Sequence, residues 1–498
     1  MNIKEAKNQI RDTLRAYLKK DSLGNYLIPP VRQRPILLMG PPGIGKTQIM
    51  EQIAAEENVG LVAYTITHHT RQSAVGLPFI EKRTFGGVEY TVTEYTMSEI
   101  IASVYSLMEE TGIKEGILFL DEINCVSETL APMMLQFLQC KTFGNQKLPE
   151  GWLIAAAGNP PEYNKSVRDF DIVTLDRVKR MDITEDLGVW MEYAMHRGLH
   201  GAVISYLDIR KDDFYLVETT ADGAQFVTAR GWEDLSEIIY AYEKLGIRVD
   251  RSVVEQYLQC PRIAKEFANY LALYYKYQKT YHVDEILTGQ VQRITVSEFR
   301  AAPFDEKLSV MGLLLSRLSD AARAVRYQDT LTSALHRTLQ EFKGRIPSEA
   351  PAAALQSLIG ERMKQMKLSV QAGQQEKETR DLRQREINAL EEYLTMLRRE
   401  ELTDSEEAMD TVRTLFRAEV DKRSALGSEC GTQFDNAFRF LENAIGPTQE
   451  MVLFVTRITA GYDTSWFVEN FGCDAYFRNN RELLFDETRS RIEAAIRE

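Results

Sequence analysis

The residues from Gly40 to Thr47 have the types and spacing of a phosphate-binding loop. They read Gly40-Pro-Pro-Gly43-Ile-Gly45-Lys46-Thr47, which fits GxxxxGK[ST] at every fixed position. Glycines allow positive φ and a close backbone approach, so successive amides can surround polyphosphate oxygens at the positive end of a helix. Lys46 would then reach the β- and γ-phosphates, and the Thr47 hydroxyl would bind Mg²⁺.

The segments on either side of this loop fit the same interpretation. The apolar run from Pro35 to Met39 predicts a short buried strand, and the spacing from Gln48 to Ile53 predicts the start of a helix. A Gly/Pro turn followed by a chance Lys-Thr pair is disfavoured, because that strand and helix are the required context. The residues expected to contact a nucleotide are Gly40, Pro41, Pro42, Gly43, Ile44, Gly45, Lys46, Thr47 and Gln48.

Two carboxylates, Asp121 and Glu122, follow a second apolar run, Ile117 to Leu120. Four apolar residues in a row indicate a buried parallel strand, and ligands meet an open α/β sheet at the carboxyl ends of its strands. We expect Asp121 to hold Mg²⁺, directly or through its other ligands, and Glu122 to polarise the attacking water. Acidic pairs after strands are often only solvated, but this pair follows a complete phosphate loop and favours hydrolysis.

Two further residues are candidates with weaker signals. Asn159 ends a third apolar run, Leu153 to Ala157, and its neutral amide can orient water or touch a γ-phosphate. Taken alone, an Asn before Pro160 is more typical of a turn. Arg177 lies in a later polar segment, where an arginine is ordinarily a surface residue, so a role for it requires another subunit.

Taken in order, four stretches resemble the AAA+ ATPases, in particular their MoxR branch, over roughly residues 30 to 280. The stretches are GPPGIGKT at 40–47, ILFLDEIN at 117–124, AAAGNP at 155–160 and LDRVKRMDI at 175–183. The resemblance implies Walker A at 40–47, Walker B at Asp121 and Glu122, and sensor 1 at Asn159. It therefore implies ATP and Mg²⁺ as cofactors.

The same resemblance assigns two arginines. The LDR motif places an arginine finger at Arg177, and the segment Thr228-Ala229-Arg230-Gly231-Trp232 is similar to sensor 2, which assigns Arg230. The Phe common after LDR in this branch is replaced here, so Lys179 and Arg180 are rival cations, and Arg168 is a weaker one. Because a finger supplied in trans can change turnover by about 10³ to 10⁵, the resemblance implies an oligomeric ring, expected to be a hexamer.

The resemblance also implies partners and insertions. Members of the MoxR branch commonly act with a von Willebrand factor A (VWA) domain protein that carries a metal-dependent adhesion site. A hairpin insertion matches Phe79 to Val92, where Gly86-Gly87 supplies a turn, and a second hairpin is expected near Phe143 to Trp152. Phe85 at the first tip is either an aromatic finger for a substrate or ordinary hairpin packing.

Composition limits the class of protein. The chain has 498 residues, enough for two to four domains, and its formal net charge of −13 disfavours nucleic acid as the main substrate. Its five scattered cysteines indicate reducing cytosol, with neither a disulfide framework nor a zinc site. The N-terminus lacks an apolar signal segment and no window approaches 18 uninterrupted apolar residues, so we expect a cytoplasmic protein without a membrane span.

The predicted fold class is α/β, with a P-loop AAA+ core containing a parallel sheet, an α-helical lid and an additional all-α C-terminal region. The core is expected over 1–190, the lid with sensor 2 over 191–280 and the C-terminal region over 281–498.

Residues 361–425 are charge-rich and almost free of Gly and Pro, with Gly373 the exception, which predicts a long helical hairpin or coiled-coil arm over about 355–425. Ile387, Leu390, Leu394 and Leu397 give it an apolar stripe, and Thr403-Asp404-Ser405 is expected to form a turn and N-cap near its tip. The arm is either a partner-binding element or a solvated structural helix pair.

The leading hypothesis is a Mg²⁺-dependent ATPase that remodels a protein partner. A nucleic-acid-directed motor or loader is the second, and it would require a basic stripe that the acidic composition disfavours. The motor subunit of a metal chelatase is the third, because the same nucleotide motifs would serve it. A nucleotide-gated scaffold with little hydrolysis is disfavoured by Glu122 and Arg177.

Overall fold

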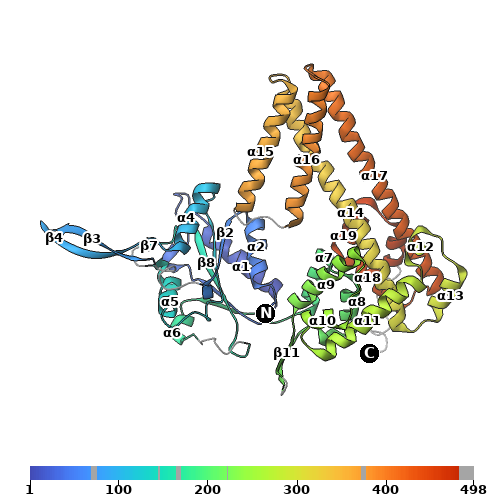
Figure 1. Cartoon of the computed structure of the whole chain (residues 1–498), viewed down its shortest axis with the longest axis horizontal. Helices are drawn as coiled ribbons and strands as arrows, with labels where there is room; N and C mark the ends of the chain where they lie inside the picture. The colour runs from blue at the N-terminus through green and yellow to red at the C-terminus, as the bar shows by residue number, and fades with distance from the viewer. Residues whose placement is uncertain (69–75, 144–145, 164–169, 221–222, 372–376, 482–498) are drawn as a thin grey trace, which may run out of the picture. The chain divides into compact units, whose positions relative to one another are not determined.

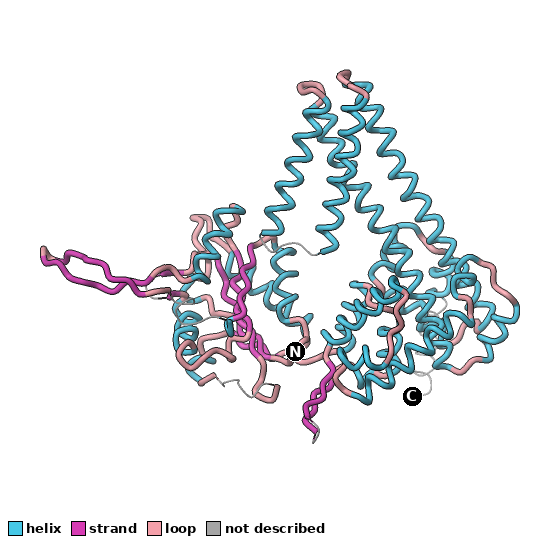
Figure 2. Tube along the Cα trace, viewed as in Figure 1, coloured by secondary structure: helices cyan, strands magenta, loops and turns pink. Residues whose placement is uncertain are grey.

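The computed structural model describes residues 1–68, 76–143, 146–163, 170–220, 223–371 and 377–481 (Figure 1). The chain divides into two compact units. The sheet unit comprises residues 1–186 and 361–383, and the helical unit comprises residues 187–360 and the chain from 384 onward. Within the described residues, strands are confined to the sheet unit and to one hairpin of the helical unit (Figure 2).

The sheet unit is built on five strands in the order β2-β5-β8-β1-β9, and every neighbouring pair is parallel. Leu37 in the strand that follows Pro35 pairs with Ala156 on one side and Arg180 on the other. The third apolar run of the sequence therefore lies between the first and the second, which brings their three carboxyl ends together. The strands are β1 (Ile36–Met39), β2 (Gly60–Thr65), β5 (Gly116–Asp121), β8 (Trp152–Gly158) and β9 (Lys179–Asp182).

Helices cover both faces of this sheet. Ile36 and Leu38 of β1 pack with α1 (Ile3–Leu18) and α2 (Lys46–Glu57), whereas the alternate residues Leu37 and Met39 pack in the cluster formed with α4 and α5. Burial on both faces explains why the strand sequences are continuous apolar runs rather than alternating ones. The covering helices on the second face are α4 (Glu99–Thr111) and α5 (Ala131–Cys140).

The sheet unit also contains two β-hairpins outside its central sheet. β3 (Pro78–Phe85) and β4 (Val88–Tyr95) form a long, exposed hairpin that extends away from the sheet (Figure 1). Gly86 and Gly87 turn it with φ of 60° and 85°, values that suit the twist of a two-residue turn. The second hairpin is shorter than the sequence predicted, because β6 (Thr142–Phe143) pairs with β7 (Gln146–Lys147), and Trp152 instead begins the buried strand β8. Shorter elements of this unit are η1 (Pro30–Arg32), η2 (Ile66–His68) and α6 (Ile172–Leu175).

The helical unit has one continuous apolar core, which runs from Trp190 to Tyr476 in sequence. A hairpin of β10 (Leu216–Thr220) and β11 (Gly223–Val227) interrupts its first helices and was not predicted from the sequence. The first helices are α7 (Leu187–Arg197), α8 (Gly201–Ile209), α9 (Ala229–Leu245), α10 (Arg251–Tyr257) and α11 (Pro261–Thr280), with η3 (Lys211–Asp213) after α8. They are followed by α12 (Val283–Thr288), α13 (Arg293–Ala301), α18 (Gln449–Ala460) and α19 (Tyr462–Phe471).

Four long helices account for the predicted all-α region. α14 (Phe304–Arg345) is one helix of 42 residues, although the apolar spacing of the sequence alone predicts two separate helices, over 308–318 and 321–342. α17 (Ser405–Ala444) begins at the predicted turn, where the Asp404 carboxylate accepts hydrogen bonds from the Glu406 and Glu407 amides. The other two are α15 (Pro351–Gln371) and α16 (Lys377–Arg399), and the predicted apolar stripe of α16 is buried at Ile387, Leu390, Leu394 and Leu397. No helix in the described part of the chain is both long and apolar enough to cross a membrane.

Candidate active site

The site lies at the carboxyl edge of the parallel sheet, where β1, β8 and β5 end beside one another. β1 leads into the glycine-rich loop, β8 leads into Asn159, and β5 ends at Asp121. Because β8 lies between the other two strands, its terminal side chain is positioned between the loop and the carboxylates. This strand order, rather than sequence distance, is what assembles the site.

The loop adopts a conformation that requires glycine. Gly43 and Gly45 have φ of 73° and 92°, in the region that side chains disfavour. A Cβ on Gly40 would lie 2.7 Å from the Ile183 carbonyl oxygen, so this position also excludes a side chain. Gly45 is the N-cap of α2, and within the described chain no side chain caps that end. The loop therefore presents the positive end of α2, which is the geometry of an anion cradle.

Lys46 lies inside this cradle and is 8% exposed as a whole residue. It donates hydrogen bonds to the carbonyl oxygens of Gly40 at 2.7 Å and Pro41 at 2.9 Å, and to Asn159 Oδ1 at 2.8 Å. These three acceptors are neutral oxygens. Phosphate oxygens would form stronger, charge-assisted hydrogen bonds with the same ammonium group, so the residues present fit a polyphosphate ligand.

Thr47 and Asp121, the two residues expected to bind Mg²⁺, lie side by side. The Thr47 hydroxyl donates to Asp121 Oδ2 at 3.0 Å, and Asp121 Oδ1 accepts from the Glu122 amide at 2.9 Å. A hydroxyl and a carboxylate side by side are the hard oxygen ligands that Mg²⁺ prefers. Among the described residues, His, Cys, Asp and Glu do not gather in threes. A metal ion held here would therefore take its other ligands from phosphate and water.

Glu122 is held by a residue that the sequence analysis did not single out. Its backbone has φ of 57°, and the turn is closed by a hydrogen bond from the Cys125 amide to the Glu122 carbonyl at 2.9 Å. The Thr67 hydroxyl, just beyond β2, donates to Glu122 Oε2 at 2.9 Å. A left-handed backbone at a non-glycine residue is costly, and such strain gathers at functional sites. The turn at Glu122 therefore sets the direction of its side chain, and the neutral Thr67 hydroxyl holds one of its carboxylate oxygens.

Asn124 is the second residue that was missed. It is 3% exposed, and its amide forms a two-point contact with the Asn159 main chain, donating to the carbonyl at 2.7 Å and accepting from the amide at 3.3 Å. Gly158 makes room for it, since a Cβ there would lie 2.6 Å from Asn124 Oδ1. Asn124 fixes the Asn159 backbone, so the Asn159 side chain can bond to Lys46. The available signal was an Asn two residues after the acidic pair.

Arg177 follows α6 and lies apart from this cluster. α6 is capped by Asp171, whose pKa is held below its usual value by hydrogen bonds from the Thr174 side chain and main chain. The exposed Arg177 side chain donates to Gln139 of α5. The structure therefore gathers the Walker and sensor 1 candidates but leaves Arg177 at the surface of its own protomer.

The rival cations differ in their contacts. Arg180 forms an ion pair with Asp182 at 2.8 Å, and Lys179 donates to Thr13 at 2.6 Å. Arg168 lies outside the described residues. Arg230, the sensor 2 candidate, is an exposed residue in the first turn of α9 in the helical unit, after Thr228 caps that helix.

A family match covers the residues of this cluster. Residues 36–175 match the family "ATPase family associated with various cellular activities (AAA)". That segment contains the whole cluster, so it forms an AAA-family ATPase domain. A search of curated proteins gave no match. A crystal structure of NtrX from Brucella abortus in complex with ADP aligns at 17% identity and a TM-score of 0.24, over 42% of this chain and 45% of that one.

Proposed function

We propose that this AAA-family ATPase is a Mg²⁺-dependent ATP hydrolase of the MoxR type, which works as a homo-oligomeric ring and remodels a protein partner. One observation carries the catalytic part of the proposal. Lys46, Thr47, Asp121, Glu122 and Asn159 meet at one edge of the sheet in the arrangement needed to bind and hydrolyse a nucleoside triphosphate.

Each side chain has a separate task in this proposal. Bound Mg²⁺–ATP would supply a terminal phosphate that is open to attack by water. Lys46 would exchange its neutral acceptors for phosphate oxygens, and Thr47 with Asp121 would hold the metal ion. Glu122 would accept a proton from the attacking water, and Asn159 would orient that water or the phosphate without adding charge.

The ring is supported by the surface around Arg177. Ile172 and Val173 of the neighbouring helix α6 are 85% and 58% exposed, which suits a face covered by another subunit. We prefer Arg177 as the finger because the LDR motif places it there, and its described partner is the neutral Gln139, whereas Arg180 is paired with the Asp182 carboxylate. Arg230 at the start of α9 is the proposed sensor 2, and the helices of residues 191–280 are the proposed lid.

The proposed partner surface includes the β3–β4 hairpin. Isolated two-stranded hairpins are marginally stable in water, and this one exposes apolar side chains along its length. Phe85 and Tyr90 near the tip form a ring contact with centroids 6.1 Å apart. Exposed apolar patches of this kind mark interaction sites. By resemblance to the MoxR branch, we propose a VWA-domain protein as the partner.

Capture of a trapped complex tests the proposal. In Glu122→Gln, ATP binding is expected to persist while hydrolysis falls by about 10² to 10⁴-fold, so affinity capture with ATP followed by mass spectrometry should recover a protein partner. Glu128→Gln, a change in the exposed loop nearby, is the matched control and should retain wild-type turnover. Wild-type turnover in Glu122→Gln would reject the assigned base. Recovery of nucleic acid without protein would favour a nucleic-acid motor.

Mixing two inactive variants tests the ring. Lys46→Met and Arg177→Ala should each be inactive alone, and a mixture should regain activity, because some interfaces would combine an intact cradle with an intact guanidinium. Arg180→Ala is the control and should remain active without mixing. If Arg177→Ala hydrolysed ATP at the full rate as an isolated protomer, the proposal that two subunits share each active site would be rejected.

A further inference from the structure

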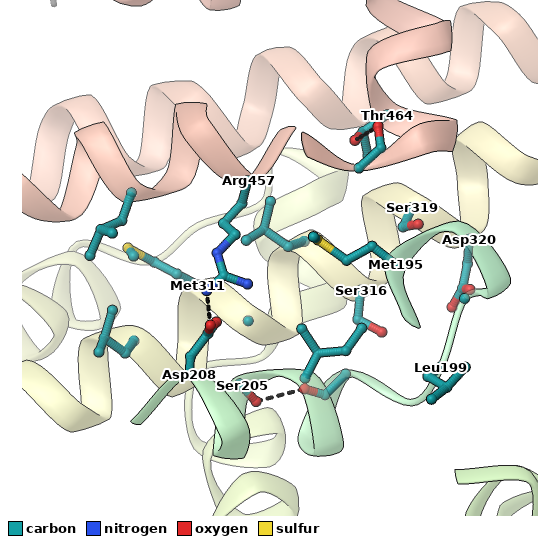
Figure 3. A pocket seen from close by; sticks show the side chains of 18 of the residues that line it. Met195, Leu199, Ser205, Asp208, Met311, Ser316, Ser319, Asp320, Arg457 and Thr464 are labelled. Carbon is teal, nitrogen blue, oxygen red and sulfur yellow. Dashed lines mark hydrogen bonds and ion pairs between the residues drawn. The ribbon is translucent and has the colours of Figure 1, made fainter. Parts of the chain in front are cut away.

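Charged side chains around a cavity in the helical unit are paired within the chain (Figure 3). The cavity has a volume of about 290 Å³ and is lined by residues of α8, α14 and α18. Arg457 pairs with Asp208, and Arg323 pairs with Asp463. These pairs compensate the charges inside the chain itself, so the cavity does not indicate a charged ligand. The nucleotide site of the sheet unit contains a polar contact of another kind, between Asn124 and Asn159, which does point to a ligand.

The Asn124 side chain continues the hydrogen bonding of the sheet past the end of a strand. β5 ends at Asp121, and beyond it the Ile123 amide still donates to the Ala157 carbonyl of β8 at 2.9 Å. The Asn124 carboxamide then donates to the Asn159 carbonyl at 2.7 Å and accepts from the Asn159 amide at 3.3 Å. A carboxamide carries the same donor and acceptor as a peptide group, so Asn124 takes the place of a strand neighbour for Asn159.

This contact is buried and closely fitted. Asn124 is 3% exposed, and a Cβ on Gly158 would lie 2.6 Å from its Oδ1 atom. Gly158 does not have a positive φ, so the position needs glycine for its space and not for its backbone conformation. A shorter side chain at position 124, or any side chain at position 158, would therefore release the main chain of Asn159.

The restrained main chain determines where the Asn159 side chain lies. Its Oδ1 atom accepts from Lys46 Nζ at 2.8 Å, so the side-chain amide faces the ammonium group in the phosphate cradle. The other end of this amide is an N–H donor, and a donor forms its stronger hydrogen bonds with charged acceptors such as phosphate oxygens. ATP has a terminal phosphate that ADP lacks. A correctly placed Asn159 would therefore favour the triphosphate over the diphosphate.

We propose that Asn124 is a positioning residue that acts through Asn159 and makes the site distinguish ATP from ADP. This role rests on the function proposed for the site, because it requires a bound nucleotide. Asn124 itself does not contact the nucleotide. Loss of its carboxamide leaves Lys46 and the glycine-rich loop in place but allows Asn159 to turn away from the terminal phosphate.

Calorimetric titration of the full chain with adenylyl imidodiphosphate, a non-hydrolysable ATP analogue, and with ADP measures this discrimination. Asn124→Ala should weaken the analogue about tenfold and leave ADP within about twofold, because a hydrogen bond to a charged group is lost only with the triphosphate. Asn124→Asp, which keeps the shape but loses the donor, should have the same effect. Equal weakening of both ligands, or a wild-type ratio of affinities in both variants, would overturn the proposal.

A buried asparagine elsewhere in the chain is the matched control. Asn436 of α17 is 7% exposed, and its carboxamide donates to the Leu287 carbonyl at 2.8 Å. Asn436→Ala should lower the thermal unfolding temperature about as much as Asn124→Ala but leave the ratio of the two nucleotide affinities unchanged. If it lowered the ratio as much as Asn124→Ala, the effect would be one of general destabilisation and the proposal would be rejected.

Double variants test whether Asn124 acts through Asn159. Asn159→Ala should lower the ratio of affinities as much as Asn124→Ala does, and the two changes together should lower it no further. Gly158→Ala keeps both asparagines but occupies the space of the Asn124 carboxamide, so it should lower the ratio as well. An additive loss in Asn124→Ala/Asn159→Ala would reject action through Asn159.

Failure of this role and failure of the proposed function give different results. A wild-type protein that binds both nucleotides but does not hydrolyse ATP would reject the proposed function, while the affinity ratios would still decide the role of Asn124. A wild-type protein that hydrolyses ATP, with unchanged ratios in the Asn124 variants, would reject only the role of Asn124. A wild-type protein that binds neither nucleotide would reject both.

Discussion

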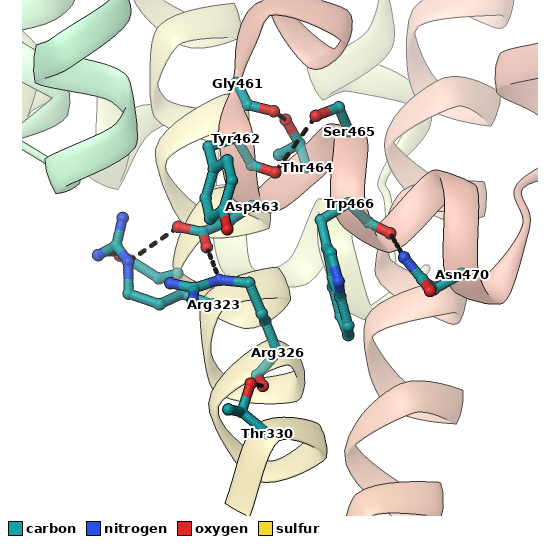
Figure 4. A network of polar contacts seen from close by, with 11 residues as sticks. Arg323, Arg326, Thr330, Gly461, Tyr462, Asp463, Thr464, Ser465, Trp466 and Asn470 are labelled. Atoms are coloured by element: carbon teal, nitrogen blue, oxygen red, sulfur yellow. Dashed lines mark hydrogen bonds and ion pairs between the residues drawn. The ribbon is translucent and has the colours of Figure 1, made fainter. Parts of the chain in front are cut away.

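Two buried clusters of charge, one in each unit, are built in opposite ways. In the sheet unit, the Lys46 ammonium group donates its three described hydrogen bonds to neutral oxygens. In the helical unit, the fully buried Asp463 carboxylate accepts from two guanidinium groups, those of Arg323 and Arg326 (Figure 4). In the first cluster the described acceptors are groups that phosphate oxygens could replace, whereas the second cluster holds a buried carboxylate between two cations.

This difference predicts which cluster serves stability. Burial of a charge removes its hydration, and only an opposite charge with good geometry compensates fully. The Asp463 cluster has that compensation, so its loss would leave uncompensated charge in a folded core. The described bonds of Lys46 go to neutral oxygens that phosphate oxygens could replace, so its replacement should change nucleotide binding more than stability. Mutations in the two clusters should therefore separate stability from nucleotide binding.

Replacing Asp463 should have the largest effect on stability. Asp463→Ala leaves two guanidinium groups without their acceptor and should lower the unfolding free energy by about 3–5 kcal/mol. Urea denaturation followed by circular dichroism measures this loss. Asp474→Ala, at an exposed acidic residue nearby in sequence, is the control and should change stability by less than about 0.5 kcal/mol. Equal effects of the two variants would show that the buried cluster is not structural.

Replacing Lys46 should affect binding rather than stability. Lys46→Met removes the contacts to two phosphates and should weaken binding of a fluorescent ATP analogue by about 10²-fold, or about 3 kcal/mol. The unfolding free energy without nucleotide should fall by much less than in Asp463→Ala, because the described groups left without Lys46 are neutral acceptors rather than charges. A loss of stability as large as that of Asp463→Ala would contradict the comparison.

A second buried lysine, Lys141, shows what burial of an ammonium group does to stability where no ligand is proposed to bind it. It donates to Gln33 at 3.3 Å, and burial, assisted by Lys147, lowers its pKa from 10.5 to about 8. The unfolded chain thus binds more protons between pH 8 and 10.5, so stability should rise with pH across that window by up to about 3 kcal/mol. Denaturation at pH 7.5 and 10 measures this rise.

Lys141→Met should remove that rise and stabilise the protein at pH 7, where the wild-type ammonium group is charged and buried. Lys147→Met is the matched control, because Lys147 is an exposed lysine of β7, in the hairpin that directly follows Lys141. It should retain most of the pH dependence. A pH-independent wild type over this range would show that Lys141 is solvated.

The sequence predicted elements whose signals are local. The apolar runs of β1, β5 and β8 were recognisable because both faces of the sheet are covered. The turn before α17 was recognisable from Asp404 as a helix cap. The continuity of α14 was not, because Ser319 and Asp320 interrupt its apolar pattern. In the structure α14 continues through these two residues, so the interruption is a polar stretch of one helix rather than its end.

In the candidate active site too, the sequence predicted residues with a local signal and missed residues whose contacts depend on the fold. Lys46, Thr47 and Asp121 were assigned because each belongs to a motif with fixed spacing. Thr67 and Asn124 were missed, because their roles depend on which strands are neighbours. Thr67 reaches Glu122 only because β2 pairs with β5, and sequence spacing does not determine strand order.

Thr67 gives the smallest effect and the finest test of how the site is restrained. Its hydroxyl occupies one oxygen of Glu122, so it competes with the water that Glu122 must polarise. Thr67→Val removes this hydrogen bond with little change of shape and should raise the basal hydrolysis rate by about fivefold, the equivalent of about 1 kcal/mol. Thr67→Ser keeps the hydroxyl and should restore the wild-type rate, while ATP affinity stays constant in all three proteins. A fall in rate for Thr67→Val, recovered in Thr67→Ser, would mean instead that the hydroxyl orients Glu122 for the reaction.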